Sequence, residues 1–184
     1  MTYDMLDKTG TKDTSGFDKK SNRFAEEHQV IHGFVTVVKN EGREDEQVLC
    51  KNVHNVLTDS GRDAMHVALY TNTGAAAQIP FKFIALSVNT GGFSASHTAL
   101  AGEIESGGLS RALATTQFHS GGSNQSTIAK TFTATGTHTA VQLSALFDEI
   151  GPPVTGVMGH ENTFTPASLE SADTLTVTWT LTLG

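Results

Sequence analysis

The chain has 184 residues, 38% of them hydrophobic, and a formal net charge of −7 from 12 basic and 19 acidic side chains. This length supports one full hydrophobic core and is short for two ordinary domains. The acidic balance provides no broad positive surface for phosphates, so we expect no nucleic-acid partner. No apolar run approaches the roughly 20 residues that a membrane-spanning helix needs, so we expect no membrane contact.

Residues 1–27 mix both charge signs with Gly, Ser and Thr, and their apolar residues follow no period. Alone, such a segment cannot bury enough surface to offset the entropy of ordering it. We therefore expect residues 1–27 to form an extended N-terminal arm before a single domain over residues 28–184. Something outside the core of that domain must hold the arm, and its expected anchors on a partner are Tyr3, Leu6, Phe17 and Phe24.

The start of the chain and its one cysteine indicate the compartment. The first 22 residues are polar and charged, unlike a secretory signal peptide, so we expect the chain to be made and used in a cytoplasm. Cys50 has no second cysteine with which to form an intramolecular disulfide. We interpret it as a small apolar residue in a strand.

Residues 28–39 are rich in β-branched and aromatic residues and predict a strand, and residues 44–53 are interpreted as its hairpin partner after a turn at residues 40–43. The next stretch, NVLTDSGRDAMHVALY at residues 55–70, predicts an amphipathic helix that ends at residues 72–74. Its first turn can be capped by Thr58 or by Asp59. The inward face is predicted to carry Leu57, Ala64, Met65, Ala68 and Leu69, and the outward face Arg62, Asp63 and His66.

Further strands are predicted at residues 81–88, 109–118, 126–134 and 140–147, a spacing typical of a sandwich or barrel. Gly-rich surface loops are expected at residues 89–96 and 119–126. Residues 97–108 predict a short helical turn that ends at Gly107 and Gly108. Pro152 and Pro153 exclude regular structure around them.

The last segment, residues 173–183, alternates between apolar residues and threonines. One face is predicted to carry Leu175, Val177, Trp179, Leu181 and Leu183. A strand with one core face and one polar face belongs to an antiparallel sheet. We therefore expect an all-β fold with one short helix: an antiparallel, jelly-roll-like β-sandwich in which the helix closes an uncovered face or end.

Candidate chemistry is sparse. The eight histidines include no HxH or HExxH spacing, and no GxSxG motif is present. Acidic residues beside glycines, such as Glu103, Glu105, Asp148 and Glu149, are more typical of solvated turns than of a general acid and base. We expect no catalytic residue, no metal, no cofactor and no enzymatic activity. An exposed Phe93 in the loop 89–96 is an expected partner contact.

The order of these features resembles small structural proteins from the virion-morphogenesis modules of tailed bacteriophages and related archaeal viruses. The resemblance covers roughly residues 30–184. Its loose motifs comprise Asn55, Thr58, Gly61 and Arg62, then Leu100-Ala101-Gly102-Glu103, Gly108-Leu109 and Arg111, and last Asp173-Thr174-Leu175. Such proteins include head decoration proteins, turret or adaptor subunits, and tail or fibre components.

The resemblance implies a non-enzymatic virion structural protein, assembled in the host cytoplasm. We expect a head-surface decoration or cementing subunit that forms a homo-oligomer, with a trimer favoured, and binds the major capsid or tail protein of the same virion through its arm. A tail, baseplate or fibre-associated component is the first alternative. A carbohydrate-binding module with its site on the loops 89–96 and 119–126 is the second. The residues expected to have structural roles are Thr58, Gly61, Arg62, Glu103, Arg111 and Trp179, with Glu103 bonded to Arg111.

Overall fold

The computed structural model describes residues 31–70, 81–119, 121–122, 124–150 and 156–183. These residues belong to one unit, Ile31–Gly184. The predicted arm at residues 1–27 and the predicted helix stop at residues 72–74 lie outside the described residues, as do Pro152 and Pro153.

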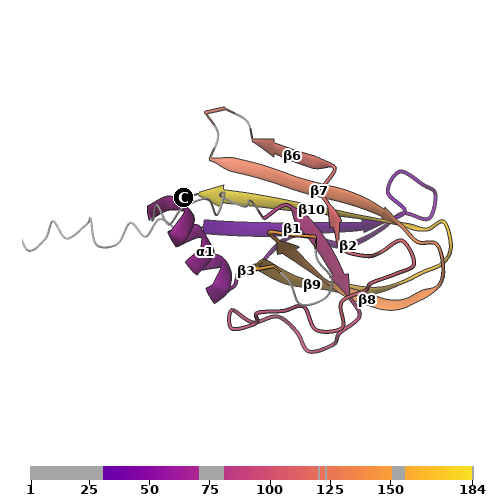
Figure 1. Cartoon of the computed structure of the whole chain (residues 1–184). Coiled ribbons are helices and arrows are strands. Elements are labelled where there is room, and N and C mark those ends of the chain that lie inside the picture. The colour runs from indigo at the N-terminus through magenta and orange to yellow at the C-terminus, as the bar shows by residue number, and fades with distance from the viewer. Residues whose placement is uncertain (1–30, 71–80, 120, 123, 151–155, 184) are drawn as a thin grey trace, which may run out of the picture. The chain divides into compact units, whose positions relative to one another are not determined.

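The described chain forms two five-stranded sheets and one helix, α1 (Asp59–Tyr70) (Figure 1). The first sheet, in the order β2-β1-β10-β7-β6, contains β1 (Ile31–Lys39), β2 (Gln47–His54), β6 (Thr116–His119), β7 (Gln125–Thr133) and β10 (Thr174–Leu183). The second, in the order β3-β9-β8-β4-β5, contains β3 (Val56–Leu57), β4 (Phe83–Ser87), β5 (Ala112–Leu113), β8 (His138–Phe147) and β9 (Met158–Leu169). Every strand pair is antiparallel, so the prediction of a mainly β, antiparallel fold is confirmed.

Strand β10 lies at the centre of the first sheet, between β1 and β7. Leu175, Val177 and Trp179 are fully buried, in agreement with the alternation in the sequence. Trp179 also joins the two sheets, because its indole N–H donates to Ser144 Oγ of β8 at 3.3 Å. The alternation fails at the end of the strand, where Leu183 is 63% exposed. The expectation that Leu183 is a core residue was therefore wrong.

Helix α1 begins directly after Thr58, one of the two predicted caps, whereas Leu57, predicted on its inward face, lies in β3. Thr58 is the cap, since its Oγ1 accepts a hydrogen bond from the backbone N–H of Gly61 at 3.0 Å. Ala64 and Met65 are partly buried against the core, whereas Arg62 on the other face is exposed. The helix packs against β9, so its inward face completes the core beside that strand.

Two predicted elements differ in the structure. The strand predicted at residues 109–118 is divided into β5, which pairs with β4, and β6, which pairs with β7 in the other sheet. Residues 97–108 contain turns and no helix, because Glu103 forms an isolated bridge with Ser87 and Ile104 donates to the carbonyl of Leu86. The backbone of this segment therefore bonds to the end of β4 and forms short turns, not a helical turn.

Strand β9 was not predicted, although it spans 12 residues and lies between β3 and β8. Its sequence, MGHENTFTPASL, contains a proline and shows no clean alternation. Register shifts interrupt its pairing with β8, which agrees with the irregular pattern.

The buried position of Trp179 generates the first prediction. Replacing Trp179 with Ala should reduce the free energy of unfolding by about 3 to 5 kcal/mol, because it leaves a cavity between the sheets. Urea denaturation monitored by far-UV circular dichroism measures this loss. Leu183→Ala is the control at the exposed end of the same strand, with an expected change within about 0.5 kcal/mol. Equal effects of the two substitutions would contradict the placement of β10.

Candidate interaction surface

Several of the motif residues singled out from the sequence lie at or near the first turn of α1, which packs against β9. The Thr58 hydroxyl, besides capping α1, donates to the carbonyl of Met158 at the start of β9. Gly61 lies against the backbone of Gly159, and a Cβ added at Gly61 would stand 2.5 Å from the carbonyl oxygen of Gly159. A larger residue at Gly61 would therefore push α1 away from β9.

Arg62, one residue further along the helix, is different. Its guanidinium forms an ion pair with Asp59, and both side chains are exposed, at 64% and 54%. An exposed pair of this kind contributes little to stability. The structural role expected for Arg62 is therefore limited to the surface of the first helical turn.

Glu103 and Arg111 form the ion pair expected from the sequence. Arg111 Nη2 and Nε donate to the two carboxylate oxygens of Glu103 at 2.6 and 2.8 Å, and each side chain is 2% exposed. The Arg111 guanidinium also lies 3.5 Å from the centre of the Phe147 ring. The pair joins the loop after β4 to the residue before β5 and to the end of β8. Glu103 is thus a buried residue, not a solvated one.

Asn40, in the turn between β1 and β2, bonds to Asp173, in the turn that precedes β10. Asn40 is fully buried, and its amide nitrogen donates to Asp173 Oδ1 at 2.9 Å. Asp173 Oδ2 accepts from the backbone N–H of Glu170 at 2.9 Å and pairs with Lys39 Nζ at 2.9 Å. The bond from Glu170, followed by those from Asn40 and Lys39, lowers the pKa of Asp173 to about 2.

Phe93, the partner contact expected in the loop 89–96, is 40% exposed. Tyr3, Leu6, Phe17 and Phe24 lie outside the described residues. The loop that carries Phe93 is fastened to β9, because Glu161 accepts from the backbone N–H of Ser94 at 3.2 Å and lies 2.8 Å from His97 Nδ1. Phe93 is thus an exposed aromatic ring on an anchored loop.

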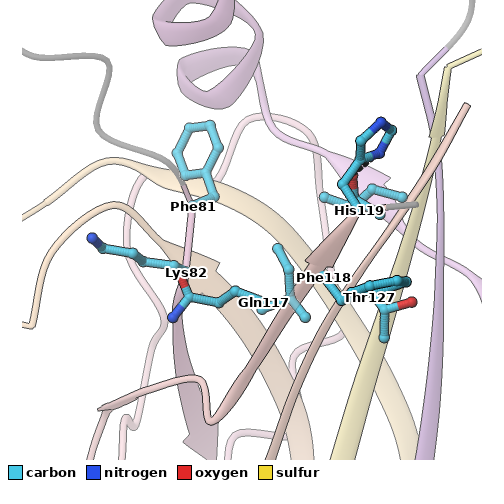
Figure 2. Close-up of a pocket in the computed structure, with 9 residues that line it drawn as sticks. Phe81, Lys82, Gln117, Phe118, His119 and Thr127 are labelled. Carbon is cyan, nitrogen blue, oxygen red and sulfur yellow. Dashed lines mark hydrogen bonds between the residues drawn. The ribbon is translucent and has the colours of Figure 1, made fainter. Parts of the chain in front are cut away.

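A shallow groove of about 290 Å³ lies beside β6, the last strand of the first sheet (Figure 2). Its lining residues are Phe81, Lys82, Gln117, Phe118, His119, Ser126, Thr127, Ile128 and Leu181. Figure 2 shows Phe81 and Lys82 on one side, and Phe118 and Thr127 on the other. All four residues of β6 are exposed, and Phe118 is 61% exposed. The groove and this edge strand form the candidate interaction surface, because an edge strand presents backbone groups that another strand can pair with.

A group of buried polar residues on β9 was missed by the sequence reasoning. His160 is fully buried, and its Nδ1 lies 2.7 Å from the Asn55 amide nitrogen. Its Nε2 has no hydrogen-bond partner among the described residues. The rings of Phe81 and Trp179 pack near it, and burial lowers the pKa of His160 to about 4. No local signal in the sequence identifies this residue, because Asn55, Phe81 and Trp179 around it come from three distant segments.

The described residues contain no group of three or more His, Cys, Asp or Glu side chains that could hold a metal ion. Within the same part of the chain, no helix is long and apolar enough to cross a membrane. No protein-family model, curated protein or solved structure matches the chain.

The buried ion pair leads to a prediction about stability. Arg111→Met should cost about 3 to 5 kcal/mol of unfolding free energy, because it leaves the Glu103 carboxylate buried without its partner. The double variant Glu103→Leu with Arg111→Met should lose less than the sum of the two single variants. Urea denaturation provides the values. Arg62→Ala, which breaks an exposed pair, is the control and should cost less than about 1 kcal/mol. An Arg111→Met loss as small as that of Arg62→Ala would refute the buried pair.

His160 predicts how stability depends on pH. Its pKa is about 6.5 when unfolded and about 4 when folded, so the unfolded chain takes up the proton first. Neutral His160 makes its full contribution to the free energy of unfolding above pH 6.5. As the pH falls toward 4, the free energy of unfolding decreases by on the order of 3 kcal/mol.

Measured between about pH 6.5 and 5, the loss of unfolding free energy should be smaller in His160→Gln than in the natural chain. Asp173→Asn is the control, because the lowered pKa of Asp173 acts only below pH 3.8. Identical pH profiles for the natural chain and His160→Gln would show that His160 is not held neutral in the core.

Proposed function

We propose that the chain is a non-enzymatic virion structural protein, a decoration or cementing subunit of the head surface. In this proposal the two sheets form a jelly-roll-like sandwich that oligomerises as a trimer, and residues 1–27 extend along a neighbouring shell protein. The protein would be located in the virion, and its partner would be the major capsid or tail protein of the same virion.

The observation that carries the proposal is the placement of the resemblance motifs. Thr58 and Gly61 fix α1 to β9, Glu103 and Arg111 fix a loop to β8, and Asp173 fixes two turns to each other. These residues hold the shape of the domain, and a subunit that works by being copied and packed depends on that shape. The resemblance supplies the virion context for that shape.

The edge strand β6 supports association with other copies. It pairs with β7 on one side, and none of the described strands pairs with its other side. Proteins commonly cover such edges, since an exposed edge invites pairing with another chain. A closed trimer would cover it and would bury Phe118, which is 61% exposed in the single chain. Sedimentation in native buffer measures the oligomer directly.

The proposed mechanism is stabilisation by binding only the assembled lattice. A ligand that binds one state adds RT ln(1 + [L]/Kd) to its stability, about 2.7 kcal/mol at a hundredfold excess over Kd. Many copies distributed over a shell would each contribute to its resistance to disassembly. The tail or baseplate alternative uses the same surfaces in few copies.

The carbohydrate-binding alternative finds less support. Sugar sites commonly stack a ring on an exposed aromatic side chain, and Trp179 is fully buried. Phe93, 40% exposed, is the remaining aromatic residue on a predicted sugar-binding loop. A glycan array, with Phe93→Ala as the comparison, tests this alternative.

Deletion of residues 1–25 tests the cementing proposal. The truncated protein should lose binding to particles that lack the subunit, while its melting temperature stays close to that of the full chain, because the described core begins at Ile31. Co-sedimentation with particles and a thermal melt provide the two readouts. Truncated protein that decorates particles at full occupancy would contradict the role of the arm.

A further inference from the structure

We propose that His32 and His54 form a binding site for a divalent transition-metal ion, with Cu²⁺, Ni²⁺ and Zn²⁺ as the expected ions. His32 lies near the start of β1, and His54 is the last residue of β2, the strand paired with β1. Nothing in the proposed virion role requires this site, so the two proposals can fail separately.

The distance between the rings suits a shared ion. His32 Nδ1 and His54 Nε2 are 3.2 Å apart, and the ring planes meet at 75°. Two nitrogens at this separation, each about 2.0–2.1 Å from one ion, subtend about 100° at the metal. That angle lies between those of square-planar and tetrahedral coordination, the geometries that Cu²⁺ or Ni²⁺ and Zn²⁺ favour. Water would fill the remaining positions.

The backbone around both histidines is already fixed. His32 is opposite Thr182 in the pairing of β1 with β10. After His54, the backbone N–H of Asn55 donates to the carbonyl of Gly33 at 2.9 Å. The His54 ring also packs edge-on against Phe34, with centroids 5.3 Å apart. Both ligands are therefore held close together before an ion arrives, and little ordering entropy remains to oppose binding.

The chemistry of the pair determines which ions bind. Without metal, the facing nitrogens are within hydrogen-bond distance, so one ring carries the proton between them. To bind a metal ion, both facing nitrogens must be unprotonated. The ring that donates the hydrogen bond therefore changes tautomer, so that its proton lies on the nitrogen away from the ion. Imidazole nitrogen favours Cu²⁺, Ni²⁺ and Zn²⁺, whereas Mg²⁺ and Ca²⁺ favour oxygen. The ion would join β1 to the exposed strand β2 at its last residue.

Calorimetric titration of the full, chelator-treated chain with Ni²⁺ and with Zn²⁺ tests the site. Binding should weaken about tenfold or more in His32→Gln and in His54→Gln, because each removes one of two ligands. The double variant should bind no more tightly than either single variant, and the two losses should not simply add, since the two rings act on one ion. Metal should also raise the melting temperature of the natural chain, an effect that a chelator reverses.

His119→Gln is the matched control, because His119 is also an exposed histidine on an edge strand, with its ring bonded to the carbonyl of Gln125 at 3.0 Å. It should leave the affinity unchanged, and Mg²⁺ should produce no binding signal. Melting temperatures without metal show that each variant is folded. The proposal is overturned if His32→Gln or His54→Gln binds Ni²⁺ and Zn²⁺ as tightly as the natural chain, or if the natural chain binds neither ion.

Discussion

The packing of β10 against the facing sheet is the interaction on which the rest of the structure depends. Leu175, Val177 and Trp179 are fully buried in a cluster that also contains Ile84 and Leu146 of the second sheet. Burial of apolar surface contributes roughly 25 cal/mol per Å², so each of these fully buried side chains favours the folded state. The hydrogen bond from the indole N–H of Trp179 to Ser144 of β8 also fixes how the two sheets are positioned at this point.

Buried polar groups then determine where the connecting segments lie. A buried charge or amide without a partner costs several kcal/mol, so each such group strongly favours one arrangement of its neighbours. Glu103 with Arg111 positions the long loop after β4, and Asn55 with His160 joins the start of β3 to β9. Glu161, through Ser94 and His97, likewise ties the loop of Phe93 to β9.

The sequence predicted those parts of the fold that depend on local periodicity. The alternation from Leu175 to Trp179 identified β10 and its inward face, and the Thr58 cap identified the start of α1. Strand β9 could not be predicted in this way, because His160 and Asn162 are buried polar residues whose partners come from distant segments. The division of residues 109–118 between two sheets also depends on tertiary pairing. The His32 and His54 pair was missed because cross-strand register, not sequence spacing, brings the two rings together.

A domain held together in this way suits a subunit whose activity is to be positioned on a larger assembly, and we propose that the assembly is a virion. Electron cryomicroscopy of purified particles is the most direct test. The proposal predicts two-sheet density repeated over the head surface, with a copy number that matches the lattice. Density confined to the tail would select the tail alternative, and particles that contain no copy of this chain would contradict the virion proposal itself.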